Sequence, residues 1–305
     1  MGRHQASVVA FSYDLEEGEY PYLFIHKEEG TNLLEIIMLA LLGLVSAVFG
    51  SIVGLGGGII IVPALTLLGA ELTGSTIEHP TAVGTSLAVL IVTALASTMS
   101  YAKKRRVDWR SGWMLFITSG PAAMVGSALT GHIKGGAFQL SFGIFMLLMA
   151  GLLVARDYMK PISKKWPVTR TYTDDKGVTH EYGYSVLPAL AVGLLVGLIS
   201  GLFGIGGGSL FVPVMVLLFR FPPHVATATS MFVIFLSSIL GTGVHAWLGE
   251  TNWWIVLMLV PGAWIGGKLG AYIASKMTGK ALLWLLRITF VVMAAQLIIE
   301  GLSEM

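Results

Sequence analysis

The sequence predicts an all-α membrane protein that crosses the bilayer several times, and its composition and segment lengths are the main reasons. Of its 305 residues, 55% are hydrophobic and only 12% are charged, and the mean hydropathy is +0.79. Soluble domains carry about 25% charged residues. Several apolar runs reach the roughly 20 residues that a helix needs to cross a bilayer. Backbone groups in lipid must be paired within the segment, which favours helices, and the alternating pattern of a membrane barrel is absent.

A polar segment precedes the apolar runs. It lacks the short apolar core that follows a basic start in a secretory signal. We expect residues 1–32 to form a solvated N-terminal extension with little structure.

Eight apolar runs follow, four on each side of a polar stretch. They cover 33–70, 81–101, 110–131, 137–155, 186–219, 225–248, 252–275 and 280–301. We therefore expect two repeats of about four transmembrane helices each, at 33–156 and 186–301, joined by a cytoplasmic linker at 157–185. The first and fifth runs are too long for one straight span, so each should contain a helix that is broken by glycine or is re-entrant.

The two halves repeat one pattern of glycine and hydroxyl residues. GLGGGIIIVPAL begins at Gly54 and GIGGGSLFVPVM begins at Gly204, and each is followed by a Thr-Ser pair, in AVGTS and ATATS. A duplication of this size is typical of secondary transporters. An even number of crossings in each half would make the repeats parallel and an odd number would invert them, and the sequence leaves this open.

Basic residues favour one orientation in the membrane. The loop KKRRVDWR (103–110) and the stretch 156–184 hold most of the Lys and Arg residues, and a count of eight crossings puts both on one side. The positive-inside rule then places both, together with the two termini, in the cytoplasm. Within the second stretch, TYTDDKGVTHEY alternates around a turn and predicts a small β-hairpin.

Each glycine cluster predicts a broken helix that binds an anion. Three consecutive glycines weaken a helix by roughly 1 kcal/mol each relative to alanine, and the proline removes a further backbone donor. A break is tolerated where it lines a cavity, and its amides and helix dipole then attract an anion. Close packing of helices is the alternative use of such glycines. The candidate substrate-binding glycines are Gly54, Gly56, Gly57, Gly58, Gly204, Gly206, Gly207 and Gly208.

Polar side chains in the apolar runs complete the candidate site. The hydroxyls either bind the substrate or bind backbone groups, which is their commoner use in membrane helices. Arg287 is either a counter-charge for the substrate or a donor to backbone carbonyls, because a cation in lipid is costly. If transport is coupled to protons, the histidines are the candidates, since no carboxylate lies inside the spans. The residues concerned are Thr85, Ser86, Thr229, Ser230 and Arg287, with His79, His224 and His245.

Signatures of enzymes are missing. GAWIGGKL (262–269) has the spacing of a phosphate-binding loop, but Leu269 stands where Ser or Thr must bind magnesium. The sequence has no dinucleotide fingerprint, no metal-ligand spacing and no cysteine. We therefore expect no catalytic residue, no metal and no cofactor. The expected partners are a small anion and the lipid bilayer, with no nucleic acid, and a homo-oligomer is one option.

The paired segments GLVSAVFGSIVGLGGGIIIVPAL and GLLVGLISGLFGIGGGSLFVPVM, with AVGTS, ATATS and PGAWIGGKLGAYIA, resemble the sulfite exporter TauE/SafE family, also called the TSUP family. The likeness covers about residues 43–302. It implies export or exchange of small sulfur-containing anions, such as sulfite or sulfonates, across the cytoplasmic membrane without ATP hydrolysis by this chain.

Three hypotheses follow. The first is a secondary transporter whose halves rock around an anion held between the two glycine breaks, the anion being sulfite, a sulfonate or another small anion. The second is a membrane scaffold or signalling protein in which the glycines serve helix packing and the cytoplasmic linker recruits another protein. A sealed bundle with no central cavity and continuous helices through both clusters would favour this hypothesis. A membrane enzyme is the third, and no catalytic constellation supports it.

Overall fold

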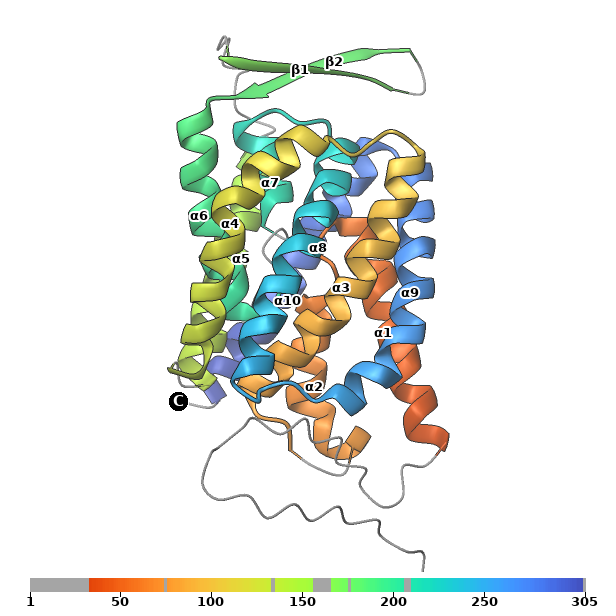
Figure 1. The fold of residues 1–305 in the computed structure, drawn as a ribbon, viewed down its shortest axis with the longest axis vertical. Helices are drawn as coiled ribbons and strands as arrows, with labels where there is room; N and C mark the ends of the chain where they lie inside the picture. Colours follow the sequence, from red (N-terminus) through yellow and green to blue (C-terminus); the bar gives the residue numbers. More distant parts are fainter. Residues whose placement is uncertain are drawn as a thin grey trace, which may run out of the picture.

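The computed structural model describes residues 33–73, 76–132, 135–155, 166–174, 177–205 and 210–303. This part of the chain forms a bundle of ten α-helices with a β-hairpin across one end (Figure 1). Seven of these helices are long and apolar enough to cross a membrane. The predicted all-α polytopic fold is therefore confirmed, whereas the N-terminal extension lies outside the described residues.

The first half of the chain enters the bundle from the end away from the hairpin (Figure 1). A broken pair, α1 (Leu33–Val53) and α2 (Gly58–Thr73), begins and ends there. Three helices then cross the bundle in turn: α3 (His79–Lys103), α4 (Trp109–Leu129), which continues into the short 3-10 helix η1 (Thr130–His132), and α5 (Gly135–Ala155).

The second half enters from the hairpin end. Its broken pair, α6 (Val186–Phe203) and α7 (Phe211–Leu218), begins and ends there. Three helices again cross the bundle: α8 (Pro223–Trp247), α9 (Trp253–Lys276) and α10 (Gly279–Ser303). The two halves thus run through the bundle in opposite senses.

The path of the chain differs from the sequence-based count of eight crossings. The loop after α3 lies at the hairpin end, because Arg170 of the hairpin binds Asp108 in that loop. The start of α1 and the end of α10 lie at the other end (Figure 1). Each broken pair returns to its own side and adds no crossing. The start of α1 and the end of α10 therefore lie on the side opposite to the basic loop 103–110, whereas the sequence predicted the termini on the same side as that loop.

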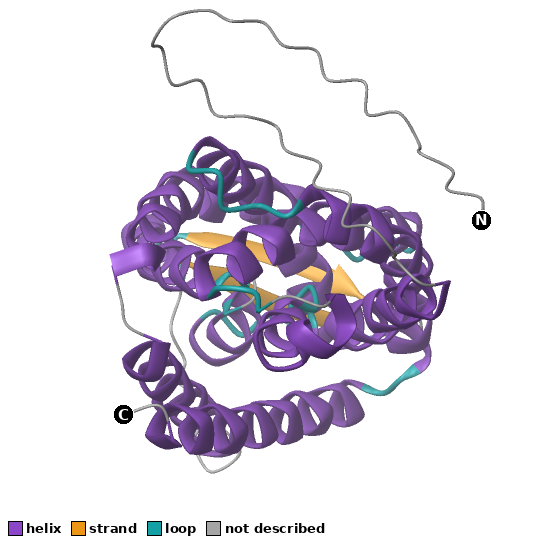
Figure 2. Cartoon of the chain, turned by 90° about the horizontal axis from the view of Figure 1, so that it is seen from below, coloured by secondary structure: helices purple, strands orange, loops and turns teal. Residues whose placement is uncertain are grey.

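Glycines let neighbouring helices approach closely. A Cβ atom added to Gly43 of α1 or to Gly266 of α9 would collide with a backbone carbonyl of the other helix. The glycines of PGAWIGGKLG therefore serve close helix packing in this structure. In Figure 2 the bundle is seen from below, with α10 along one edge and the hairpin across the far end.

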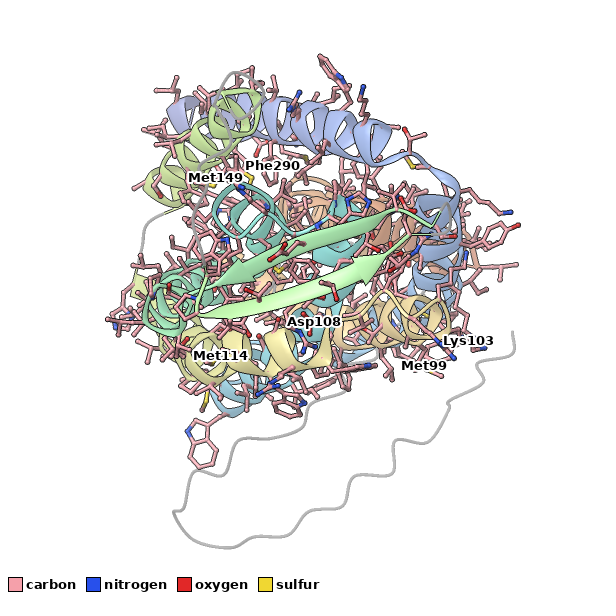
Figure 3. The ribbon with its side chains drawn as sticks, turned by 90° about the horizontal axis from the view of Figure 1, so that it is seen from above. Met99, Lys103, Asp108, Met114, Met149 and Phe290 are labelled. Carbon is pink, nitrogen blue, oxygen red and sulfur yellow. The ribbon has the colours of Figure 1, made fainter. Side chains whose placement is uncertain are left out.

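The hairpin predicted from TYTDDKGVTHEY is present. It consists of β1 (Val168–Thr173) and β2 (Thr179–Tyr184), antiparallel, with Val168 opposite Tyr184. The ring of Tyr182 packs 4.3 Å from that of Phe221, and the amide of Gly183 donates to the carbonyl of Phe219 at 3.2 Å. The hairpin is therefore attached to the loop between α7 and α8, and it lies over the bundle when viewed from above (Figure 3).

Candidate functional site

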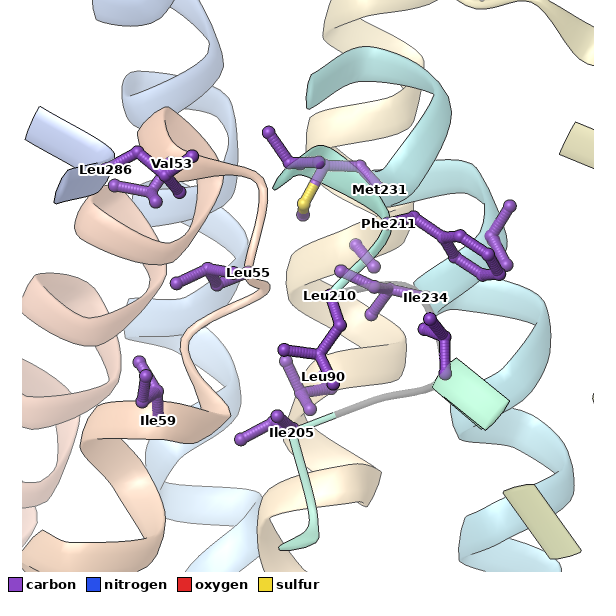
Figure 4. Packing of buried hydrophobic residues seen from close by; sticks show 14 of the residues in the cluster. Val53, Leu55, Ile59, Leu90, Ile205, Leu210, Phe211, Met231, Ile234 and Leu286 are labelled. Carbon is purple, nitrogen blue, oxygen red and sulfur yellow. The ribbon is translucent and has the colours of Figure 1, made fainter. Parts of the chain in front are cut away.

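The two glycine clusters meet in the core, beside α3 and α8, the two most deeply buried spans. A Cβ atom added to Gly58 would lie 2.6 Å from the carbonyl oxygen of Gly204 and 3.0 Å from Cα of Ile205. Figure 4 shows the apolar side chains around this meeting point, including Ile59, Leu90 and Ile234. All three are at most 1% exposed, so the clusters meet in a buried part of the bundle.

The first cluster breaks its helix through left-handed backbone. Gly54, Gly56 and Gly57 have φ of 83°, 77° and 100°, a region that only glycine adopts readily. The carbonyl of Gly50 accepts the amides of residues 54, 55 and 56 at 2.8, 2.8 and 3.1 Å, which ends α1. The chain then starts α2 at Gly58. The predicted glycine break is confirmed in this segment.

The second cluster ends α6 in the same way. Gly204 has φ of 68°, and the amide of Ile205 donates to the carbonyl of Ser200 at 3.2 Å. Gly206, Gly207 and Gly208 lie outside the described residues. The predicted binding role of the glycines in both clusters stays a prediction.

Two serines join each glycine cluster to the other half of the chain. Ser230 of α8 donates its hydroxyl to the carbonyl of Gly54 at 2.9 Å, and also contacts the carbonyl of Thr227. Ser86 of α3 donates to the carbonyl of Gly204 at 3.2 Å. Both serines are fully buried. Each half therefore holds the broken helix of the other half in place.

The threonines next to these serines also form hydrogen bonds with the opposite half of the chain. Thr85 accepts the backbone amide of Asn252 at 3.0 Å, and Thr229 accepts that of Asp108 at 3.0 Å. Asn252 and Asp108 are the N-cap residues of α9 and α4. The four hydroxyls thus bind backbone groups of the opposite half, one of the two roles expected from the sequence, and contact with a substrate stays a prediction.

The two serine contacts lie toward opposite ends of the bundle. Ser230 follows Thr229, which binds Asp108 at the hairpin end. Ser86 follows Thr85, which binds Asn252 at the start of α9, at the other end. The Ser230–Gly54 contact is therefore on the hairpin side of the site, and the Ser86–Gly204 contact is on the opposite side.

A small cleft reaches the start of α2 from the end away from the hairpin. Its walls come from α2, from the start of α3 and from the pair α5 and α10. The lining residues are Gly58, Ile59, Val62, Pro63, Thr66, His79, Gln139, Phe142, Leu297 and Glu300. Of the three candidate histidines, His79 is the one that lines this cleft.

The remaining candidates are spread over the bundle. Arg287 is buried in α10, with its guanidinium carbon 5.4 Å from the ring centre of Trp284. That helix packs mainly along α5, and it also touches α1 and α8. His224 is near the start of α8, at the hairpin end. His245 is fully buried near the end of α8, with Nδ1 2.8 Å from a carboxylate oxygen of Glu250. The structure therefore does not gather Arg287 and the three candidate histidines into one cluster.

Sequence reasoning missed a polar cluster around Asp108. The buried carboxylate accepts hydrogen bonds from the hydroxyl of Ser111 at 2.7 Å, from Arg170 at 3.1 Å and from the hydroxyl of Tyr182 at 3.0 Å. Burial alone would raise the pKa of Asp108, but the bonds from Ser111 and Arg170 prevail and hold that pKa below its ordinary value. The position of Asp108, just before Trp109 at a helix start, was the available signal of an N-cap.

Arg170 is therefore expected to fasten the hairpin. In Arg170→Ala, protease should cleave the hairpin several-fold faster than in the wild type, because the buried Asp108 carboxylate loses its cation. In the wild type, the rate at which protease cleaves the hairpin should not change between pH 5 and 8. The attachment is present above the ordinary pKa of 3.8 and is lost only as the pH falls through the lower folded-state value. Limited proteolysis measures this, with Arg110→Ala as the control, and equal rates in both variants would contradict the role.

Comparison with known proteins identifies the family. The family model described as "Sulfite exporter TauE/SafE" matches residues 39–297. A probable membrane transporter protein of Bacillus subtilis, YunE, is 45% identical over 88% of this chain and 99% of its own length. A probable membrane transporter protein of Xylella fastidiosa is 30% identical over 77% of this chain and 83% of its own length.

No solved structure matches the chain. Among the residues that the structure describes, no three His, Asp or Glu side chains gather as metal ligands. The family match covers residues 39–297, which include the apolar helices and both broken helix pairs. The chain is a multi-pass membrane transporter that belongs to the sulfite exporter TauE/SafE family.

Proposed function

We propose that the protein is a secondary transporter that exports or exchanges small sulfur-containing anions, such as sulfite or organosulfonates, by alternating access. The observation that carries this proposal is the meeting of two glycine clusters in the core, each held by a serine of the other half. Broken helices facing each other near the bilayer midplane are a common basis for transporter sites. The sulfur-containing class is supported by the name of the matching family.

The anion binds between the two clusters in this proposal. The start of α2 at Gly57 and Gly58 supplies backbone amides and the positive end of a helix dipole, which together favour an oxyanion. In the second half, Gly206, Gly207 and Gly208 correspond in sequence to Gly56, Gly57 and Gly58, and we expect the same role for them. The hydroxyls of Thr85, Ser86, Thr229 and Ser230 stand next to these loops, and Arg287 provides positive charge from α10.

Substrate entry requires the two halves to move apart. In this structure the clusters are closed on each other, because even a Cβ atom at Gly58 would approach the Gly204 carbonyl to 2.6 Å. Release of the Ser230–Gly54 contact opens the site toward the hairpin, and release of the Ser86–Gly204 contact opens it toward the other end. His79, His224 and His245 are the candidates for coupling this movement to protons.

The orientation follows from the basic residues. The positive-inside rule favours the hairpin end in the cytoplasm, and we assign the protein to the cytoplasmic membrane. The starts of α1 and α6 lie at opposite ends of the bundle. We therefore assign the two halves as inverted repeats, with three crossings and one broken pair in each.

The scaffold hypothesis is less well supported. Continuous helices through the glycine clusters would favour it, whereas residues 54–57 separate α1 from α2. Close helix packing is already provided by other glycines, such as Gly43 and Gly266.

Counterflow of labelled sulfite in proteoliposomes tests the proposal. Wild-type protein should accumulate label against unlabelled sulfite, and Arg287→Ala should slow the uptake, because the positive charge that attracts the anion is lost. Transport of carboxylates but not of sulfite or sulfonates would keep the transporter and reject the substrate class. Absence of flux with every anion tried would overturn the proposed function.

A further inference from the structure

A groove with three lysines lies on the outer face of the bundle, where α3 and α9 reach the hairpin end. Its volume is about 360 Å³, and its described lining is Met99, Ser100, Lys103, Lys104, Lys268, Ala271 and Tyr272. No carboxylate is among these residues. The groove is separate from the glycine clusters, and Met99 and Lys103 lie at the edge of the molecule when it is seen from above (Figure 3).

Two of the three lysines contact aromatic rings. Lys268 Nζ lies 4.3 Å from the ring centre of Trp264, and Lys104 Nζ lies 5.3 Å from that of Tyr272. Lys104 also donates to the hydroxyl of Ser275. Lys268 thus lies over a ring one turn earlier in its own helix, whereas Lys104 reaches from the end of α3 to α9.

The groove combines positive charge with apolar walls near the hairpin ends of two helices that are long and apolar enough to cross a membrane. Lys103 is the last residue of α3, whereas Lys268 lies about two turns before the end of α9. Met99 is 46% exposed and Tyr272 is 57% exposed, both on helices that cross the membrane. A soluble anion would use only the lysines, but a phospholipid would also cover the apolar walls with its acyl chains.

We propose that this groove binds the phosphate headgroup of an anionic phospholipid. Basic pockets between transmembrane helices on the cytoplasmic side are a recognised type of lipid site, and each lysine near an anionic surface contributes about 1 kcal/mol. The lipid bridges α3 of the first half to α9 of the second half. The inference does not depend on which anion is transported.

Lipid titration of purified protein tests the site. Phosphatidylglycerol in mixed micelles should raise the thermal unfolding midpoint more than phosphatidylcholine does, and native mass spectrometry should count the bound lipids. The variant Lys103→Gln with Lys268→Gln should weaken phosphatidylglycerol binding roughly 30-fold, the factor that corresponds to two lysines at about 1 kcal/mol each. Inorganic phosphate and glycerol 3-phosphate are the soluble probes, and neither should reproduce the shift.

A control pair removes the same charge elsewhere at the hairpin end. Arg110 and Lys280 are both exposed there, so Arg110→Gln with Lys280→Gln should keep wild-type lipid binding. Equal loss in both double variants would mean that only diffuse charge attracts the lipid, and would overturn the site. An equal shift with inorganic phosphate would reassign the groove to a soluble anion.

Discussion

Gly57→Trp is expected to abolish sulfite counterflow while the protein still inserts into the membrane. Gly57 has φ of 100°, where a residue with a side chain costs about 1–2 kcal/mol. A Cβ atom there would also lie 2.7 Å from the carbonyl oxygen of Ser46. The new side chain therefore displaces the loop that presents the start of α2 to the anion. Flux should fall to the background of empty liposomes.

Gly243→Trp is the matched control for that variant. Gly243 is exposed on α8, and a Cβ atom added there meets nothing within 4 Å. The control should transport like the wild type, because its tryptophan faces outward from the bundle. Size-exclusion profiles of both variants report folding. Normal flux in Gly57→Trp would remove this cluster from the binding site.

Ser86→Ala and Ser230→Ala are expected to weaken opposite sides of the closed site. Each variant leaves a buried glycine carbonyl without its serine donor, which costs about 1–3 kcal/mol of stability. Ser237 is also buried, but its hydroxyl binds the carbonyl of Val233 within its own helix, so Ser237→Ala should have a smaller effect. Thermal unfolding in detergent measures these differences.

The same two variants should also differ in transport. Loss of the Ser230 hydroxyl favours the state open toward the hairpin, and loss of the Ser86 hydroxyl favours the state open toward the other end. Exchange should slow in both, since a transporter biased toward one state waits longer for the other. If both variants exchange at the wild-type rate, the two contacts are not the closures of the site.

Much of the fold could be predicted from the sequence, because its signals are local. The apolar runs 81–101 and 252–275 correspond to α3 and α9, whose starts carry a proline at residue 80 and an N-cap at Asn252. The glycine break of the first half was predicted for the same reason, since only glycine adopts the backbone found at residues 54, 56 and 57.

The path through the membrane could not be predicted in this way. Hydropathy measures how apolar a run is, and it does not tell whether a run crosses or returns. The run 33–70 became α1 and α2, which begin and end at one side. Because this run returns and does not cross, α3 begins at the same end of the bundle as α1, and the loop after α3 lies at the opposite end.

Contacts between residues far apart in the chain were also beyond sequence reasoning. Ser86 and Gly204 are 118 residues apart, and Arg170 and Asp108 are 62 apart. Such pairs depend on how the whole bundle closes. The duplicated Thr-Ser motif identified residues of the core, but whether their hydroxyls face a substrate or a backbone carbonyl is set by the partner helix.

Alternating access between the two glycine clusters is the central claim, and a single introduced cysteine tests it most directly. The chain has no cysteine, so Ile59→Cys, at the inner end of the cleft beside Gly58, would be the only thiol. A membrane-impermeant thiol reagent should label it faster from the hairpin side in the Ser230→Ala background and from the other side in the Ser86→Ala background, and sulfite should slow both reactions. Equal labelling from the two sides in both backgrounds, unaffected by any anion, would contradict the claim.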